Sequence, residues 1–160
     1  MEKLNPREIN TTALAFLGDA VYEVYIRKHI MDFGEQNADR LHRMAVRYVR
    51  ADGQAKAVKA LMDGFLSEDE IRLVKRARNH KTSSKARSAD AVTYKLATAF
   101  EALIGYLYLG GQKERLSAIM RQAVKEIEGT FWITAFPVRD KWFVQNGRTV
   151  RLPTPLKASV

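Results

Sequence analysis

Two carboxylates stand in surroundings that usually exclude charge. Asp19 directly follows the apolar run Ala13–Gly18, and Glu101 lies in the middle of the mostly apolar run Leu96–Gly105. An unpaired carboxylate in apolar surroundings is costly, so it shifts its pKa, pairs with a buried Arg or Lys, or binds a cation. Either acid alone fits an ion pair as well as a functional site. Two such acids in two apolar segments favour a shared cation site.

A glycine accompanies each of the two acids. Gly18 directly precedes Asp19, and Gly105 follows Glu101 by about one helical turn. Because glycine inside a helix costs about 1 kcal/mol relative to alanine, we expect both glycines to permit the close approach of two helices. Two closely packed helices with one inward acid each would form a site for Mg²⁺, which proteins hold through one or two carboxylates plus water and phosphate.

Residues 1–129 show the apolar periodicity of helices over nearly their whole length. The middle of the first long helix is apolar almost all round, which is typical of a buried helix. Asp52-Gly53 is expected to separate the second helix from the third. The predicted helices span about residues 11–30, 37–52, 54–63, 67–79, 90–109 and 113–128. These elements predict an all-α domain over residues 1–129.

Residues 130–160 differ in character from the helical part and are treated as a C-terminal extension. They hold five basic residues and one acid, and Asn146-Gly147 lies between two β-prone runs. Asn-Gly in that position is a strong signal for a type I′ turn. We therefore predict a β-hairpin over residues 142–152, and we expect it to pack on the helical body or on a second chain because a lone hairpin is marginal in water.

Composition limits the class of protein further. The chain has 160 residues and a net charge of +9, and it has no cysteine, which excludes a disulfide scaffold, a zinc ribbon and a cysteine nucleophile. It shows no secretory signal and no stretch of 18 apolar residues, so we expect a cytoplasmic protein that does not enter a membrane. Nucleic acid is the first polyanion to consider as its partner.

A basic run from Arg72 to Arg87 contains no acid and crosses from a helix end into a Ser/Thr-rich loop. Such a run fits phosphate contact by long flexible cations, and it also fits a solvated helix end followed by a loop. The residues of this run taken as candidate RNA contacts are Arg76, Arg78, Asn79, His80, Lys81, Lys85 and Arg87.

The segments around the two acids resemble the conserved motifs of a known family. Phe16–Val21 (FLGDAV) is similar to the signature motif of the ribonuclease III family, and Phe100–Leu109 is similar to its second conserved helix. The resemblance covers about residues 5–128, and no double-stranded RNA-binding domain follows it. That arrangement resembles the Mini-ribonuclease III subclass, in which the catalytic domain stands alone.

The resemblance implies roles for individual residues. Asp19 matches the signature aspartate, which is a catalytic metal ligand in the family, and Glu101 matches the essential glutamate of the second helix. Two further acids of the full-length enzymes correspond here to Ala15 and Thr98. A second metal site with a full set of protein ligands is therefore not expected.

The function implied by the resemblance is a Mg²⁺-dependent endoribonuclease that cuts double-stranded RNA. Its expected substrate is precursor large-subunit (23S) ribosomal RNA, and it is expected to be a homodimer with one acid pair in each protomer. The apolar residues around Phe16 and in the Leu103–Leu109 segment fit either the dimer interface or the core. The alternative function is a catalytically silent RNA-binding or ribosome-associated scaffold. The missing acids favour that alternative, but the retention of Asp19 and Glu101 disfavours it.

Overall fold

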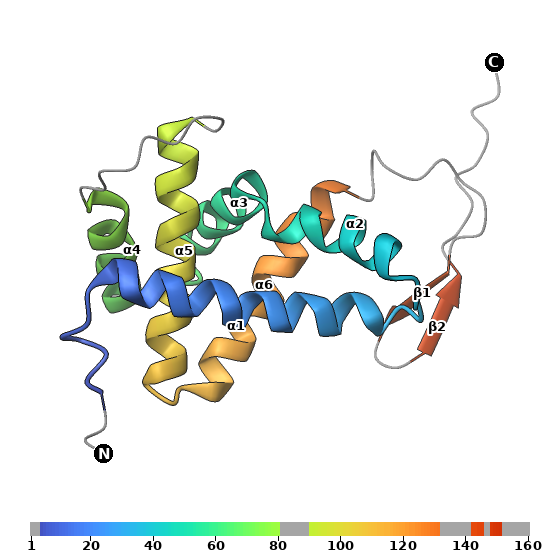
Figure 1. Cartoon of the computed structure of the whole chain (residues 1–160), viewed down its shortest axis with the longest axis horizontal. Helices are drawn as coiled ribbons and strands as arrows, with labels where there is room; N and C mark the ends of the chain where they lie inside the picture. The colour runs from blue at the N-terminus through green and yellow to red at the C-terminus, as the bar shows by residue number, and fades with distance from the viewer. Residues whose placement is uncertain (1–3, 81–89, 132–141, 146–147, 152–160) are drawn as a thin grey trace.

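The structure is a computed structural model that describes residues 4–80, 90–131, 142–145 and 148–151, with side chains over 4–80 and 90–129. Six helices form the body of the described chain (Figure 1). Their bounds are α1 Thr11–Met31, α2 Ala38–Val49, α3 Ala51–Met62, α4 Glu68–Asn79, α5 Ala91–Leu109 and α6 Lys113–Phe131. The predicted all-α character of this part of the chain is confirmed. No helix in the described ranges is long and apolar enough to cross a membrane.

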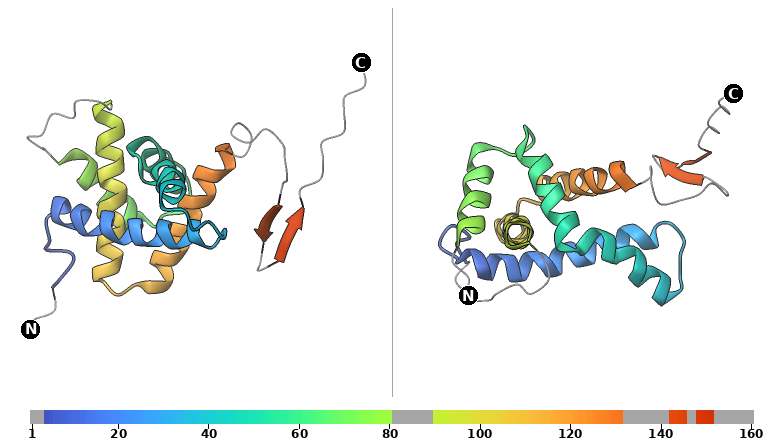
Figure 2. Two further views of the ribbon diagram at one scale, coloured as in Figure 1. Left: turned by 45° about the vertical axis from the view of Figure 1, so that its right-hand side comes forward. Right: turned by 90° about the horizontal axis from the view of Figure 1, so that it is seen from above.

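Helix α5 lies in the middle of the body, and four other helices pack around it. Seen along its axis, α5 is surrounded by α1, α3, α4 and α6, while α2 packs against α1 and α3 (Figure 2). The reason is compositional, because α5 is apolar on almost every side and buries side chains in several directions. A helix of that kind is stable only when neighbours cover it.

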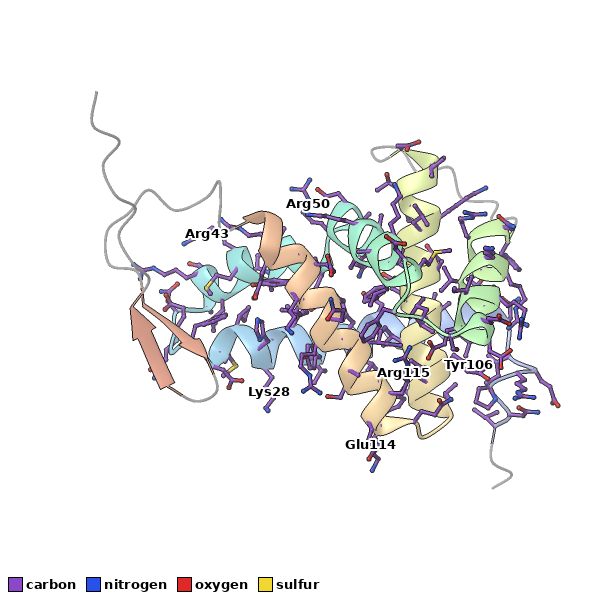
Figure 3. The ribbon with its side chains drawn as sticks, turned by 180° about the vertical axis from the view of Figure 1, so that it is seen from behind. Lys28, Arg43, Arg50, Tyr106, Glu114 and Arg115 are labelled. Carbon is purple, nitrogen blue, oxygen red and sulfur yellow. The ribbon has the colours of Figure 1, made fainter. Side chains whose placement is uncertain are left out.

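Polar contacts attach α6 to the other helices. The guanidinium of Arg115, which is labelled in Figure 3, donates to both carboxylate oxygens of Glu70 in α4, at 2.8 and 2.7 Å. It also donates to the backbone carbonyl of Phe65 at 2.8 Å. Near the other end of α6, His29 Nε2 of α1 and Tyr48 Oη of α2 each lie 2.9 Å from Glu128 Oε1. These contacts satisfy charges at the edge of the core and tie three helices to α6.

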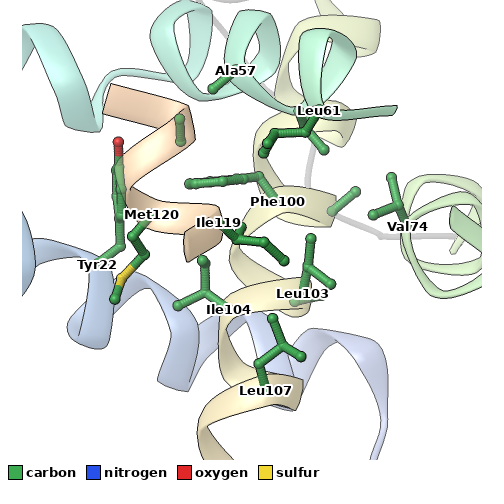
Figure 4. Close-up of a cluster of buried hydrophobic side chains, with 14 of the residues drawn as sticks. Tyr22, Ala57, Leu61, Val74, Phe100, Leu103, Ile104, Leu107, Ile119 and Met120 are labelled. Carbon is green, nitrogen blue, oxygen red and sulfur yellow. The ribbon is translucent and has the colours of Figure 1, made fainter. Parts of the chain in front are cut away.

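The core consists of side chains that converge on α5 from its neighbours (Figure 4). Tyr22 of α1 meets Phe100 of α5 edge to face, with ring centroids 4.9 Å apart, and both side chains are fully buried. The α5 residues Leu103, Ile104 and Leu107 are also buried in this core. The sequence left open whether this segment forms the core or a dimer interface, and these three residues belong to the core.

Helices α1 and α5 cross with their backbones in direct contact. A Cβ atom on Gly18 would lie 1.8 Å from the carbonyl oxygen of Glu101, and one on Gly105 would lie 2.0 Å from the carbonyl oxygen of Leu14. No side chain fits at either position. The predicted role of both glycines, close helix approach, is confirmed.

One face of α1 is open, which corrects the prediction that this helix is buried all round. Phe16 is 85% exposed and Val24 is 70% exposed, while Leu14, Tyr22 and Ile26 point into the core. Helix α1 thus carries more apolar side chains than the other helices of the chain cover. The reason is geometric, because α5 and α2 cover only part of the circumference of α1.

Two helix boundaries also differ from the sequence prediction. The break between α2 and α3 falls at Arg50, whose backbone is extended, so Asp52 and Gly53 lie inside the first turn of α3. Helix α6 continues through Gly129 to Phe131. In both cases the glycine has helical neighbours on each side, and local helix propensity at a glycine is a weak signal that the surrounding structure overrides.

Two short strands follow the helical body. Strand β1 (Trp142–Gln145) pairs antiparallel with β2 (Arg148–Arg151), with Trp142 opposite Arg151 and Gln145 opposite Arg148. They occupy the positions of the two arms of the predicted hairpin. The predicted turn at Asn146-Gly147 lies outside the described residues.

The helix crossing predicts a large effect of small substitutions. Gly18→Ala or Gly105→Ala should lower the free energy of unfolding by about 3 kcal/mol or more, because the new methyl group must displace backbone rather than a side chain. Gly129→Ala in α6 is the control, because open space surrounds its Cβ position, and it should stabilise by up to about 1 kcal/mol. Urea denaturation of the three variants measures this. Equal stability of Gly18→Ala and wild type would contradict the tight crossing.

Candidate active site

The helix crossing brings the two predicted acids together. Asp19 follows the crossing residue Gly18 on α1, and Glu101 supplies the α5 carbonyl that faces Gly18. The Asp19 carboxylate lies close enough to Glu101 to raise its pKa. Asp19 is exposed at the surface, whereas Glu101 is half-buried. The expectation that both carboxylates are shielded therefore holds more fully for Glu101 than for Asp19.

The surroundings of Asp19 and Glu101 disfavour ionisation of both carboxyls at once. Burial raises the pKa of Glu101 to about 7, the charge of Asp19 adds to this, and the amide of Gln54 opposes it. The pKa of Asp19 is also raised, first by partial burial and then by the carboxylate of Glu23. Glu23 itself pairs with Arg27 Nε at 2.9 Å. No cation of the described residues forms an ion pair with Asp19 or Glu101, so the ion-pair alternative is not supported.

The positions of the two additional acids of the full-length enzymes contribute no ligand. Ala15 is buried, and the Thr98 hydroxyl donates to the Tyr94 carbonyl one turn back at 3.1 Å. Within the described ranges, no group of three or more His, Cys, Asp or Glu side chains is placed to hold a metal ion. Two hard carboxylate oxygens with unbalanced charge fit one Mg²⁺ ion whose remaining ligands are water and phosphate.

Gln54 is a site residue that the sequence analysis missed. It lies in the first turns of α3, is 1% exposed, and sits beside the Glu101 carboxyl. Its Nε2 has no hydrogen-bond partner of ordinary geometry among the described residues. The signal in the sequence was an amide at helical spacing from Val58 and Leu61, which form the buried face of α3.

Of the candidate RNA contacts, the structure describes four at the C-terminal end of α4. Arg76, Asn79 and His80 are exposed, whereas Arg78 is half-buried and donates to the side chain of Asn79 at 3.3 Å. Lys81, Lys85 and Arg87 lie outside the described residues.

Arg76 and His80 line an open hollow together with the segment before α1, which includes Arg7 and the acid Glu8, and with Thr11 at the start of α1. Thr11 lies eight residues before Asp19 on the same helix, which is about 12 Å of helix. The structure therefore places a basic cluster, Arg7, Arg76 and His80, beside the start of the helix that carries one of the acids. Arg7 was not among the residues singled out from the sequence.

Comparison with known proteins points to one family. The ribonuclease III domain matches residues 12–112 of the chain. Mini-ribonuclease 3 of Brevibacillus brevis is 47% identical over 125 residues, which cover 78% of this chain and 92% of that protein. Mini-ribonuclease 3 of Enterococcus faecalis is 43% identical over 125 residues, which cover 78% and 95% of the two chains.

A solved structure shares the fold. The crystal structure of a protein from Fusobacterium nucleatum superposes with a TM-score of 0.66 at 37% identity, and the match covers 74% of this chain and 94% of that one. The chain belongs to the ribonuclease III family of endoribonucleases. Over most of its length it is similar to the Mini-ribonuclease 3 members of that family, as the two sequence motifs indicated.

The raised pKa of Glu101 predicts a pH-dependent stability of the metal-free protein. The folded state binds this proton more tightly than the unfolded chain, so raising the pH from 4.5 to about 7 should favour unfolding. The decrease in stability should reach up to about 3 kcal/mol, and Glu101→Gln should not show it. Urea denaturation across this range in the presence of EDTA measures the difference between the two proteins. Parallel pH profiles would contradict the shifted pKa.

Proposed function

We propose that the chain is a Mg²⁺-dependent endoribonuclease that hydrolyses phosphodiester bonds of double-stranded RNA at Asp19 and Glu101. One observation carries the proposal: two carboxylates from different helices meet at a backbone-tight crossing, both with raised pKa and neither with a cation partner among the described residues. A repelling pair with one partly buried member is costly for stability, and functional sites are where proteins retain such cost.

Asp19 and Glu101 differ in burial, and we assign them different roles in the site on that basis. The half-buried Glu101 would offer a fixed oxygen ligand, while Asp19 is exposed and would be accessible to a phosphate of the substrate. A divalent cation held between them would polarise a phosphoryl oxygen and lower the pKa of water for attack on phosphorus. Its positive charge would also remove the repulsion that raises the pKa of Glu101.

The substrate class is supported by the charge around the site. The net charge of +9 and the cluster of Arg7, Arg76 and His80 at the start of α1 suit a polyanion that runs along α1 toward Asp19. In A-form RNA the accessible groove is wide and shallow, so such contacts bind phosphates and 2′-hydroxyls rather than read base sequence. We propose Arg78, Asn79, Lys81, Lys85 and Arg87 as further RNA contacts.

The open face of α1 supports a homodimer. Ala13, Phe16, Ala20 and Val24 are all exposed and follow one another at helical spacing along one side of α1. Exposed apolar stripes of this kind mark interaction sites. The stripe borders Asp19, so a second copy packed there would place two acid pairs on opposite sides of one interface.

Within double-stranded RNA, we propose precursor large-subunit (23S) ribosomal RNA as the substrate and the cytoplasm as the location. The support is the family resemblance of the motifs that hold the two acids, together with the similarity to Mini-ribonuclease 3 proteins. Incubation with a precursor transcript and mapping of the new ends tests this assignment. Ends that differ from those of mature 23S RNA would overturn it.

The first functional prediction concerns the acids. Asp19→Asn or Glu101→Gln should reduce cleavage of long duplex RNA in Mg²⁺ by at least about 10³-fold, because each change removes a metal ligand and a charge. Glu114→Gln, which neutralises an exposed acid on α6, should cleave like wild type. Product sizes on denaturing gels give the rates. RNA binding by the wild-type protein without metal-dependent cleavage would indicate the scaffold function instead.

The second prediction concerns the basic cluster. The double substitution Arg7→Gln with Arg76→Gln should weaken binding of duplex RNA. It should also reduce the slope of log K against log salt by roughly 0.7–0.9 for each phosphate that the protein no longer neutralises. Lys113→Gln with Lys125→Gln on α6 removes the same charge and should change the slope less. Filter binding in a salt series, with Ca²⁺ in place of Mg²⁺, measures both. Identical slopes for the two double variants would show that the cluster binds no phosphate.

The third prediction concerns the dimer. Phe16→Asp should convert the dimer to a monomer, because it places a charge in the middle of the apolar stripe of α1. Val92→Asp, at an exposed valine at the start of α5, serves as the control and should stay dimeric. Sedimentation equilibrium gives the two masses. A dimeric Phe16→Asp protein would place the interface elsewhere.

A further inference from the structure

A buried amide beside the site has no explanation in packing alone. Gln54 is 1% exposed on the face of α3 that packs against α5, and its Nε2 has no hydrogen-bond partner of ordinary geometry among the described residues. A buried donor left unpaired lowers the stability of the folded protein. An apolar residue at this position would avoid that cost, so a role for the amide must outweigh it.

The surroundings of Glu101 indicate that the Gln54 amide interacts with the Glu101 carboxyl. Among the described side chains, only Asp19 and Gln54 act on the Glu101 carboxyl, and they act in opposite directions. Asp19 disfavours the charged form, whereas the Gln54 amide favours it. Thr98, one turn before Glu101 on the same helix, uses its hydroxyl on its own backbone. Gln54 is therefore the one donor of the described chain that is placed to hold this carboxylate.

We propose that Gln54 is a positioning residue for the metal ligand Glu101, with Nε2 donating a hydrogen bond to one carboxylate oxygen and leaving the other for the cation. This inference rests on the proposed function of the acid pair. A neutral amide suits the task, because an Arg or Lys in its place would satisfy the carboxylate and compete with the cation. The hydrogen bond becomes strongest when Glu101 is charged, because an ionised carboxylate is the better acceptor.

Hydrogen bonds to metal-ligating carboxylates fix their orientation, and removing one weakens metal affinity by about 10–100-fold. The small number of ligands in this site should make its metal affinity more sensitive to the loss of such a hydrogen bond. Within the described part of the chain the site has two carboxylates rather than a larger set, so each ligand oxygen carries a larger share of the affinity. Gln54 reaches the site from α3, and this makes α3 the third helix that contributes to it.

The test compares Gln54→Leu and Gln54→Met with Gln122→Leu. Gln122 on α6 donates to another glutamate, Glu126, at 2.8 Å, so its replacement removes an amide–carboxylate contact outside the acid pair. Mn²⁺ binding to the full chain is measured without RNA by electron paramagnetic resonance of the free ion. Cleavage of duplex RNA is measured across a Mg²⁺ series, and melting temperatures are recorded without metal.

The Gln54 variants should bind Mn²⁺ about tenfold or more weakly and need a correspondingly higher Mg²⁺ concentration for half-maximal cleavage. Cleavage should largely recover at saturating Mg²⁺. The melting temperature of Gln54→Met without metal should not fall, because Nε2 forms no hydrogen bond of ordinary geometry among the described residues that the variant would remove. Gln122→Leu should match wild type in Mn²⁺ affinity.

Wild-type Mn²⁺ affinity and Mg²⁺ requirement in both Gln54 variants would overturn the inference, and so would an equally weakened Mn²⁺ affinity in Gln122→Leu. Glu101→Gln separates this failure from failure of the proposed function. If Glu101→Gln abolishes Mn²⁺ binding and cleavage while the Gln54 variants keep both, only the role of Gln54 is refuted. If Glu101→Gln keeps both activities, the acid pair itself is not the site.

Discussion

The contact between the backbones of α1 and α5 is the constraint on which the rest of the structure depends. Gly18 and Gly105 let the helices approach until peptide groups touch, and no side chain fits between them. At this separation the residues beside the glycines, Asp19 and Glu101, fall within electrostatic reach of each other. A wider crossing would separate the carboxylates and would also move Tyr22 of α1 away from Phe100 of α5. The glycines are therefore part of the site although they carry no functional group.

The crossing also explains why the site is electrostatically unbalanced. Because α5 is surrounded by other helices, a carboxylate on it is partly stripped of water, and the raised pKa of Glu101 reflects that desolvation. Elsewhere in the molecule the same problem is solved by pairing. Glu70, also enclosed by the protein, receives two bonds from Arg115, and the pKa of its carboxyl is lowered rather than raised. The contrast is between a glutamate with an arginine partner and a glutamate with no cation partner among the described residues.

Helix α1 combines three features along its length. Its start borders the basic cluster, its middle carries Asp19 at the crossing, and one side presents the exposed stripe that contains Phe16. Because a helix of 21 residues is rigid over this distance, the spacing between the basic cluster, the acid pair and the exposed stripe is set by one element. This arrangement suits a substrate that is itself a rigid duplex.

The sequence by itself determined the helical class, the two acids and the reason for their glycines, because each depends on local chemistry: apolar periodicity, charge in apolar surroundings, and the cost of glycine in a helix. Local signals misplaced the break before α3, since the extended backbone of Arg50 rather than the glycine at 53 ends α2. Only the tertiary structure decided which apolar residues are core and which are surface. Phe16 and Leu103 are equally apolar in the sequence, yet one is 85% exposed and the other is buried, because the helices around α5 leave one side of α1 uncovered. Gln54 lies beside Glu101, and Arg7 lies beside Arg76, only because segments far apart in the chain pack together. The periodicity within one helix does not show which segment packs against it.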